Sequence, residues 1–126
     1  MPMTYRIDAD RGVVLTTATG VLTGRDLMAH KQQLIQDPAF RPGLVELSDV
    51  RGVTTLDVTP ADISRFVQQD SADAASLAEY RLAIVAAEAV VFGMARMYQT
   101  RAQDVVPNVR VFRTMEEAGA WLGLAQ

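Results

Sequence analysis

The sequence contains no cysteine in 126 residues, and this absence excludes several classes of site together. Disulfides, thiolate zinc sites, iron–sulfur clusters and cysteine nucleophiles all need the thiol that the chain lacks. A chain without cysteine also suits a reducing compartment, so we expect a cytoplasmic protein. No other cofactor motif is present, and no cofactor is expected.

Basic charge is scarce as well. Lys31 is the only lysine, the arginines are scattered, and the formal net charge is −3. Nucleic acid is not an expected partner, because no basic stripe is present to neutralise a phosphate backbone. No segment approaches the roughly 20 apolar residues of a membrane span, and the N-terminus lacks the pattern of a signal peptide. We therefore expect neither a transmembrane segment nor export.

Histidine is nearly absent too, since His30 is the only one. Neither a second histidine nor a suitably spaced carboxylate cluster accompanies it, so no metal site is predicted and a surface or half-buried position is expected. The sequence has no G-x-S-x-G motif and no glycine-rich phosphate loop. We expect no catalytic residue and a protein that is not an enzyme.

What the chain does have is the composition of a compact domain. Hydrophobic residues make up 49% and charged residues 21% of the sequence, a balance typical of globular proteins. The length is sufficient to bury a core without metals or disulfides. We expect a single domain over residues 1–126.

The apolar pattern predicts an alternation of strands and helices. Period-two alternation from Tyr5 to Thr17, with a turn at residues 8–12, indicates a β-hairpin. The later elements are a helix from near Gly24 to residues 37–40, a strand at 44–50, a helix from Pro60, a strand at 81–87, a helix at 91–105, a strand at 109–112 and a terminal helix after Thr114. The polar, alanine-rich residues 70–80 leave the course of the chain open there.

Each later strand is followed by a helix, and such crossovers join parallel strands. The pattern therefore predicts a mixed α/β sheet of about five strands and four helices. The hairpin would contribute an antiparallel edge.

The stretch DVRGVTTLDVTPADI, residues 49–63, resembles the STAS domains of bacterial anti-sigma-factor antagonists, and still more the small stand-alone bacterial STAS-like proteins. Their pattern is an Asp at a strand end, a Gly, and then Asp-Ser before a helix, and Asp49, Gly52 and Asp57 match its spacing. VFGMARMYQ, residues 91–99, is similar to a helix of the stand-alone group. The resemblance implies a STAS-like fold and a non-enzymatic regulatory protein that binds a protein partner.

In the antagonists, the Ser after the matched Asp is phosphorylated to control partner binding. Val58 stands at that position here and has no hydroxyl. The neighbouring Thr59 is therefore the candidate phosphorylation site, at a helix start where an anion is favoured. Capping explains the same residue fully, because Thr59, Pro60 and Asp62 form a capping box with proline at the first helical position.

The resemblance also predicts an interaction or ligand loop, whose members carry charges or hydroxyls. They are Asp49, Arg51, Thr54, Thr55, Asp57 and Thr59. Arg51 between two aspartates predicts a charge network at the carboxyl end of a parallel strand, where open α/β sheets bind ligands. Turn formation and capping explain the same aspartates, and acid–base chemistry is the weakest alternative.

Methionine and aromatic side chains on the helix at 91–105 predict an adaptable apolar surface, formed by Phe92, Met94, Met97 and Tyr98. Ordinary core packing explains them too. Some STAS-like domains resemble the lipid-binding CRAL-TRIO proteins in topology, so the alternative function is a carrier of a small molecule or lipid-type ligand. It predicts an apolar pocket beside this helix. A homodimer is also expected, because symmetric dimers are the commonest assembly.

Overall fold

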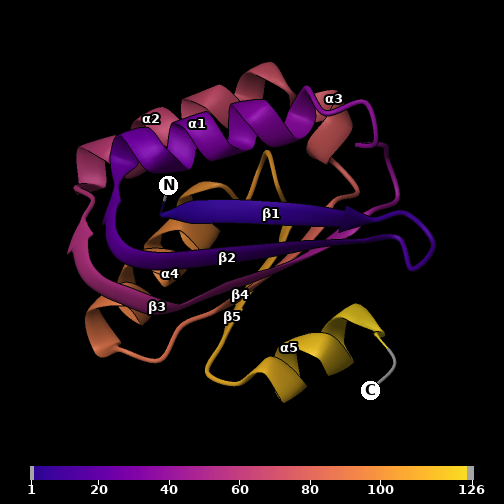
Figure 1. Cartoon of the computed structure of the whole chain (residues 1–126). Coiled ribbons are helices and arrows are strands. Elements are labelled where there is room, and N and C mark those ends of the chain that lie inside the picture. Colours follow the sequence, from indigo (N-terminus) through magenta and orange to yellow (C-terminus); the bar gives the residue numbers. More distant parts are fainter. Residues whose placement is uncertain (1, 125–126) are drawn as a thin grey trace.

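A five-stranded mixed sheet organises the chain in the computed structural model, which describes residues 2–124 (Figure 1). In chain order the elements are β1 (Met3–Asp8), β2 (Val13–Thr23), α1 (Gly24–Ile35), β3 (Val45–Asp57), α2 (Pro60–Ala72), α3 (Ala74–Leu77), β4 (Arg81–Val85), α4 (Ala89–Arg101), β5 (Asn108–Phe112) and α5 (Met115–Leu122).

The strands lie side by side in the order in which they occur in the chain. β1 pairs with β2 in the antiparallel sense, and the pairs β2–β3, β3–β4 and β4–β5 are parallel. Parallel neighbours need a crossover connection, and α1, the α2–α3 pair and α4 supply the three that are required. The predicted mixed sheet with an antiparallel hairpin at its edge is confirmed.

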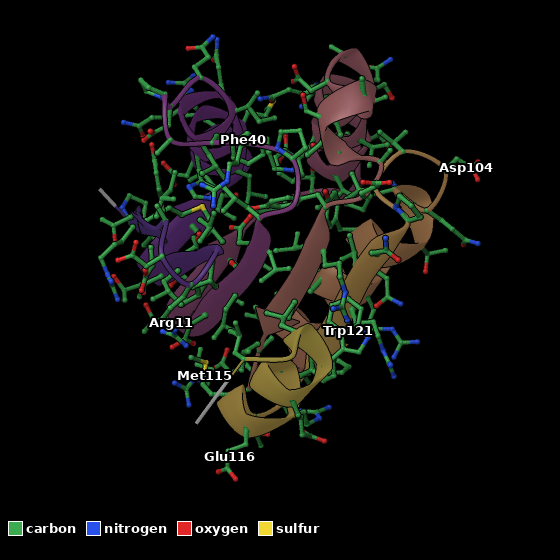
Figure 2. The ribbon with its side chains drawn as sticks, turned by 90° about the vertical axis from the view of Figure 1, so that its right-hand side faces the viewer. Arg11, Phe40, Asp104, Met115, Glu116 and Trp121 are labelled. Carbon is green, nitrogen blue, oxygen red and sulfur yellow. The ribbon has the colours of Figure 1, made fainter. Side chains whose placement is uncertain are left out.

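Helices cover both faces of the sheet. α1, α2 and α4 share one apolar core with it, whereas α5 packs alone on the opposite face. Figure 1 shows α1 and α2 above the strands and α5 below them, and Figure 2 shows Met115 and Trp121 of α5 on that lower side. β4 lies between the two layers, and Leu82 to Val85 are all buried. This explains the nearly continuous apolar run of its sequence.

Threonine side chains begin three of the helices, as the sequence predicted for Thr59. The Thr23 hydroxyl accepts a hydrogen bond from the backbone N–H of Asp26, whose carboxylate accepts one from the N–H of Thr23. Thr59 and Asp62 make the same reciprocal pair at α2, at 2.9 and 3.1 Å. The Thr114 hydroxyl caps α5. These bonds satisfy backbone donors that a helix start leaves without partners.

Two strands are longer than the sequence indicated. β2 runs on through Gly20 to Thr23, and β3 runs through Gly52 to Asp57, because the two extensions pair with each other. Register shifts next to Gly20 mark irregularities in the ladder, and Gly20 has φ 70°, which suits a residue without a side chain. The glycines are thus strand irregularities rather than strand ends. The segment predicted as a loop over Asp49 to Thr59 is mostly strand.

The segment left open at residues 70–80 contains the end of α2 and the short α3. Within residues 2–124 the helices therefore number five rather than four. Leu77 and Tyr80 are buried and attach this segment to the core. The remaining bounds differ by a few residues, since β4 ends at Val85 and α4 extends from Ala89 to Arg101.

The starts of α1 and α2 touch each other closely. A Cβ atom added at Gly24 would lie 2.5 Å from Cγ of Asp62 and 2.7 Å from its Cβ. Glycine therefore permits the approach of two helix starts whose caps lie next to each other.

We expect Gly24→Ala to lower the free energy of unfolding by about 1–2 kcal/mol, because the methyl group would displace the Asp62 side chain from the α2 cap. Gly93→Ala on α4 is the matched control, since a Cβ there meets no atom within 4 Å. It should raise stability by about 0.5–1 kcal/mol through helix propensity. Urea denaturation measures both, and equal effects of the two substitutions would contradict the close-contact argument.

Candidate functional site

The segment predicted as an interaction loop forms an exposed strip along the second half of β3. Arg51, Thr54, Thr55, Asp57 and Thr59 are exposed, and we call these five residues the β3 strip. The side chains between them, Val50, Val53 and Val58, are buried and fix the backbone to the core. The strip is consequently held on a paired strand and not on a flexible loop.

A bidentate ion pair occupies one end of the β3 strip. Nε and Nη2 of Arg51 donate to the two carboxylate oxygens of Asp49, each at 2.9 Å. The hydrogen bonds and charge of Arg51 outweigh the effect of burial and hold the pKa of Asp49 below its ordinary value. Asp57 is eight residues further along the strand, roughly 25 Å at the usual rise. It does not join the pair, and the predicted network reduces to Asp49 and Arg51.

Thr59 serves as a helix cap, as its bonds to Asp62 show. The preceding Val58, at the position of the phosphorylated serine in the antagonists, is only 7% exposed. The backbone N–H of Thr59 is the main cause that lowers the pKa of Asp62, so an anionic carboxylate adjoins the Thr59 hydroxyl. A phosphate there would meet this negative charge. Phosphorylation of Thr59 stays a prediction.

The apolar residues predicted as a surface on α4 belong partly to the core. Phe92, Met94 and Met97 are half-buried and pack against the main cluster. Tyr98 is 4% exposed, so its assignment to a surface is wrong. Its ring packs against Phe66 with centroids 5.1 Å apart, because α4 turns this side toward α2.

A buried ion pair joins the three helices above the sheet. Nζ of Lys31 on α1 donates to Oδ1 of Asp70 on α2 at 2.8 Å, and the Tyr98 hydroxyl of α4 donates to Oδ2 at 2.6 Å. Lys31 is 3% exposed and Asp70 is fully buried. Nζ also lies 4.8 Å from the centroid of the Phe66 ring, within cation–π range.

A second buried polar cluster surrounds Glu46 near the start of β3. The hydroxyl of Thr16 donates to Oε2 and that of Tyr80 to Oε1, both at 2.7 Å. Burial alone would raise the pKa of Glu46, but His30, Thr16 and Lys31 together hold it below its ordinary value. The carboxylate is therefore ionised at neutral pH. Burial, and then the charge of Glu46, raise the pKa of Tyr80, so its hydroxyl keeps the proton that it donates.

His30 lies inside the protein, contrary to the surface or half-buried position expected for it. It is 7% exposed, and the edge of its ring meets Tyr5. Its Nε2 is 3.5 Å from Oε2 of Glu46, and no residue in the range 2–124 gives this nitrogen a hydrogen bond. A buried polar atom without a partner is costly, so it marks a place where a further group would bind favourably.

Both polar clusters border a cavity of about 90 Å³ between the sheet and the helices α1, α2 and α4. Most of its lining is apolar, and the polar side chains come from the two clusters and their neighbour Ser48. The polar members are His30, Lys31, Glu46, Ser48 and Tyr98. Among the apolar members, Met3, Leu27, Leu56, Met94 and Ala95 are half-buried and therefore lie nearest to solvent.

The buried polar residues were missed from the sequence, although a signal for one of them exists. Lys31 is four residues after Leu27 and three before Leu34, so helical periodicity places it on the buried face. Asp70 fell in the segment that could not be placed. Tyr80 and Glu46 lie 34 residues apart and meet only through strand pairing.

Metal and membrane features are absent from the part of the chain that the structure describes. Within residues 2–124, no group of three or more histidine, aspartate or glutamate side chains could hold a metal ion. No helix in the same range has the length and apolar character needed to cross a membrane.

No protein-family model matches the sequence, and no curated protein matches it. Among solved structures, the chain is similar to an uncharacterized protein of the DUF3478 family with a SpoIIAA-like fold, from Shewanella loihica PV-4. The two chains are 19% identical, with a TM-score of 0.58, and the match covers 95% of this chain and 93% of that one. At this identity the likeness concerns the fold, which is SpoIIAA-like and hence STAS-like, as the resemblance predicted.

We expect Lys31→Met to cost about 3–5 kcal/mol of unfolding free energy, because it leaves the buried Asp70 carboxylate without its cation. Lys31→Met/Asp70→Asn should recover much of this loss, since the amide oxygen still accepts from Tyr98. Arg65→Met is the control. It removes the exposed pair with Asp62 and should cost less than about 1 kcal/mol. Urea denaturation measures all three, and equal costs for Lys31→Met and Arg65→Met would refute the argument.

The Glu46 cluster predicts a loss of stability in acid. Because the pKa of Glu46 is lower in the folded chain than its ordinary value of 4.5, its contribution is complete above that pH and disappears as the pH falls below it. Glu46→Gln should therefore lose less stability than the natural chain between about pH 5 and about pH 3. Urea denaturation across this range provides the comparison, and parallel pH profiles would contradict the assignment.

Proposed function

We propose that this chain is a non-enzymatic regulatory module of the bacterial cytoplasm that docks to a protein partner. The docking surface is the β3 strip together with the start of α2. The STAS-like fold supports the proposal, because the resemblance of residues 49–63 to the anti-sigma-factor antagonists concerns this same segment. The observation that carries it is that four exposed side chains lie on β3, which is paired with β2, and that the fifth, Thr59, is fixed as the cap of α2.

Rigidity is the physical advantage of this surface. Binding costs free energy when loops and side chains must be ordered, and a strand segment that is already paired with β2 as far as Asp57 avoids part of that cost. Thr54 and Thr55 have stiff β-branched side chains. Arg51 is already fixed by Asp49. The strip therefore presents hydroxyl and charged groups in one arrangement before a partner arrives.

The non-enzymatic part of the proposal rests on the carboxylates of this segment. A general acid needs a raised pKa, whereas Arg51 lowers that of Asp49. Asp57 lies too far along the strand to act with it. Docking is thus a better use of these groups than proton transfer.

We expect Thr55→Arg to weaken partner binding at least about tenfold, because it places a long charged side chain in the middle of the strip. Thr100→Arg, at a threonine that is also exposed and lies on α4, is the matched control and should bind as the natural chain does. A photoreactive residue at position 54 identifies the partner by mass spectrometry, and calorimetry with the purified partner gives the affinities. Unchanged affinity of Thr55→Arg would exclude the strip.

The role of Thr59 is separated by two further variants in the same assay. Thr59→Asn removes the hydroxyl that would accept a phosphate but caps a helix as well as threonine does, whereas Thr59→Ala removes both functions. Loss of regulated partner binding in Thr59→Asn would establish a phosphorylation switch. Normal behaviour of this variant leaves Thr59 as a cap alone.

Homodimerisation stays a prediction, which sedimentation of the purified chain can check. Equal sedimentation at all concentrations as a monomer would refute it.

A second candidate function, a carrier of a small ligand, is favoured by the cavity beside α4. The carrier alternative requires a pocket next to residues 91–105, and Val91, Met94, Ala95 and Tyr98 line the cavity from that helix. Its polar wall would orient a ligand that its apolar walls retain.

A further inference from the structure

The size of the cavity limits what can occupy it. About 90 Å³ corresponds to roughly three waters at their share of about 30 Å³ in the liquid, and an apolar cavity of about 150 Å³ holds benzene. By this measure the enclosed space takes the hydroxyl end of a short chain, and it is smaller than a space that holds a six-membered ring. A longer molecule would extend outward past Leu27 and Met94, which are half-buried members of the lining.

The helices above the sheet maintain the cavity. α2 packs between α1 and α4, and the Lys31–Asp70–Tyr98 contacts connect the three. These contacts consume the Tyr98 hydroxyl proton and both oxygens of Asp70. Among residues 2–124, Asp70 is the one hydrogen-bond acceptor that Lys31 contacts, although its Nζ carries three N–H groups. The cavity wall therefore retains hydrogen-bond donors in an otherwise apolar space.

His30 and Glu46 define the place of a ligand oxygen. Within residues 2–124, Nε2 of His30 makes no hydrogen bond, and it lies 3.5 Å from Oε2 of Glu46. One oxygen atom at about 2.8 Å from each would lie to the side of the line that joins these two atoms, on the side of the cavity. The facing carboxylate favours the imidazole tautomer in which Nε2 carries the proton, and in that tautomer Nε2 is a hydrogen-bond donor. A hydroxyl group fits best, since it can accept from Nε2–H and donate to Oε2.

Charge decides between ligands of this size. The Glu46 carboxylate lines the cavity, and a second carboxylate, that of Asp70, lies behind the wall, where Lys31 balances its charge. A ligand carboxylate next to Oε2 would be a third anion at a buried site, where repulsion is poorly screened. A ligand ammonium group could pair with Glu46, but it has no acceptor for Nε2–H of His30, and it would lose its hydration on entry. A neutral group avoids both costs.

We propose that the cavity binds a small neutral molecule with an apolar body and one hydroxyl group, which bridges Nε2 of His30 and Oε2 of Glu46, and that it discriminates against carboxylates. The proposal rests on the second candidate function, since it specifies the class of ligand that such a carrier would take. The hydroxyl completes the hydrogen bonding of His30, and the apolar body fills space next to Val91 and Phe66.

Three probes of equal length test the proposal: 1-pentanol, pentanoate and pentylamine, titrated at neutral pH and followed by ¹H–¹⁵N correlation spectra. We expect 1-pentanol to bind, with shifts at Ser48, Val91 and Ala95. Pentanoate and pentylamine should bind at least about tenfold more weakly. Stronger binding of either charged probe overturns the ligand class and leaves the carrier function in place. Failure of all three to bind overturns the carrier function as well.

Two variants connect binding to the cavity. His30→Phe keeps a ring against Tyr5 but removes Nε2, so it should weaken 1-pentanol about tenfold or more while 1-chlorobutane binding is unchanged. Ala95→Leu partly fills the cavity and should abolish binding of both. Thr100→Leu, exposed on the same helix, is the control and should bind normally. Unchanged affinity of His30→Phe for 1-pentanol would refute the assignment of the site to this cavity. If His30→Phe does not fold, unchanged affinity of Ala95→Leu would refute it.

Discussion

The contact between Lys31 and Asp70 fixes the arrangement of the helices on which the rest of the structure depends. Two fully desolvated charges are favourable only when their geometry is good and their remaining bonds are satisfied. Here the Tyr98 hydroxyl takes the second oxygen of Asp70, so each of three helices contributes one group. An apolar contact would tolerate sliding, whereas this one specifies a single relative position. That position determines both the space above the sheet and the orientation of α2 next to the β3 strip.

Local sequence patterns predicted the parts of the fold that depend on near neighbours. The caps at Thr23 and Thr59 were predictable because both partners lie three residues apart. The full length of β3 was not, because Gly52 resembles a strand end until β2 is placed beside it. The Glu46 cluster joins residues about 30 positions apart. No single pattern contains such a pair, so the candidate site could be predicted only in its exposed half.

The two proposed surfaces share one strand and therefore belong to one physical unit. Exposed residues of β3 form the strip, and buried residues of the same strand, Glu46 and Ser48, face the cavity. Val58 connects them, since it precedes the cap of α2 and also lines the cavity. A shift in the packing of α2 against its neighbours would therefore change both the β3 strip and the lining of the cavity. Because one strand carries both, the proposed partner docking and the proposed ligand binding are expected to affect each other.

Burial of the only lysine has a consequence for the chemistry of the whole surface. In the folded chain, amine-directed acylation, acetyl transfer and isopeptide formation meet no accessible ε-amino group, because Lys31 is 3% exposed. Its reaction requires the helices α1, α2 and α4 to separate. The extent of acylation at Lys31 therefore measures how often these helices separate, so this side chain is a natural reporter of conformational opening.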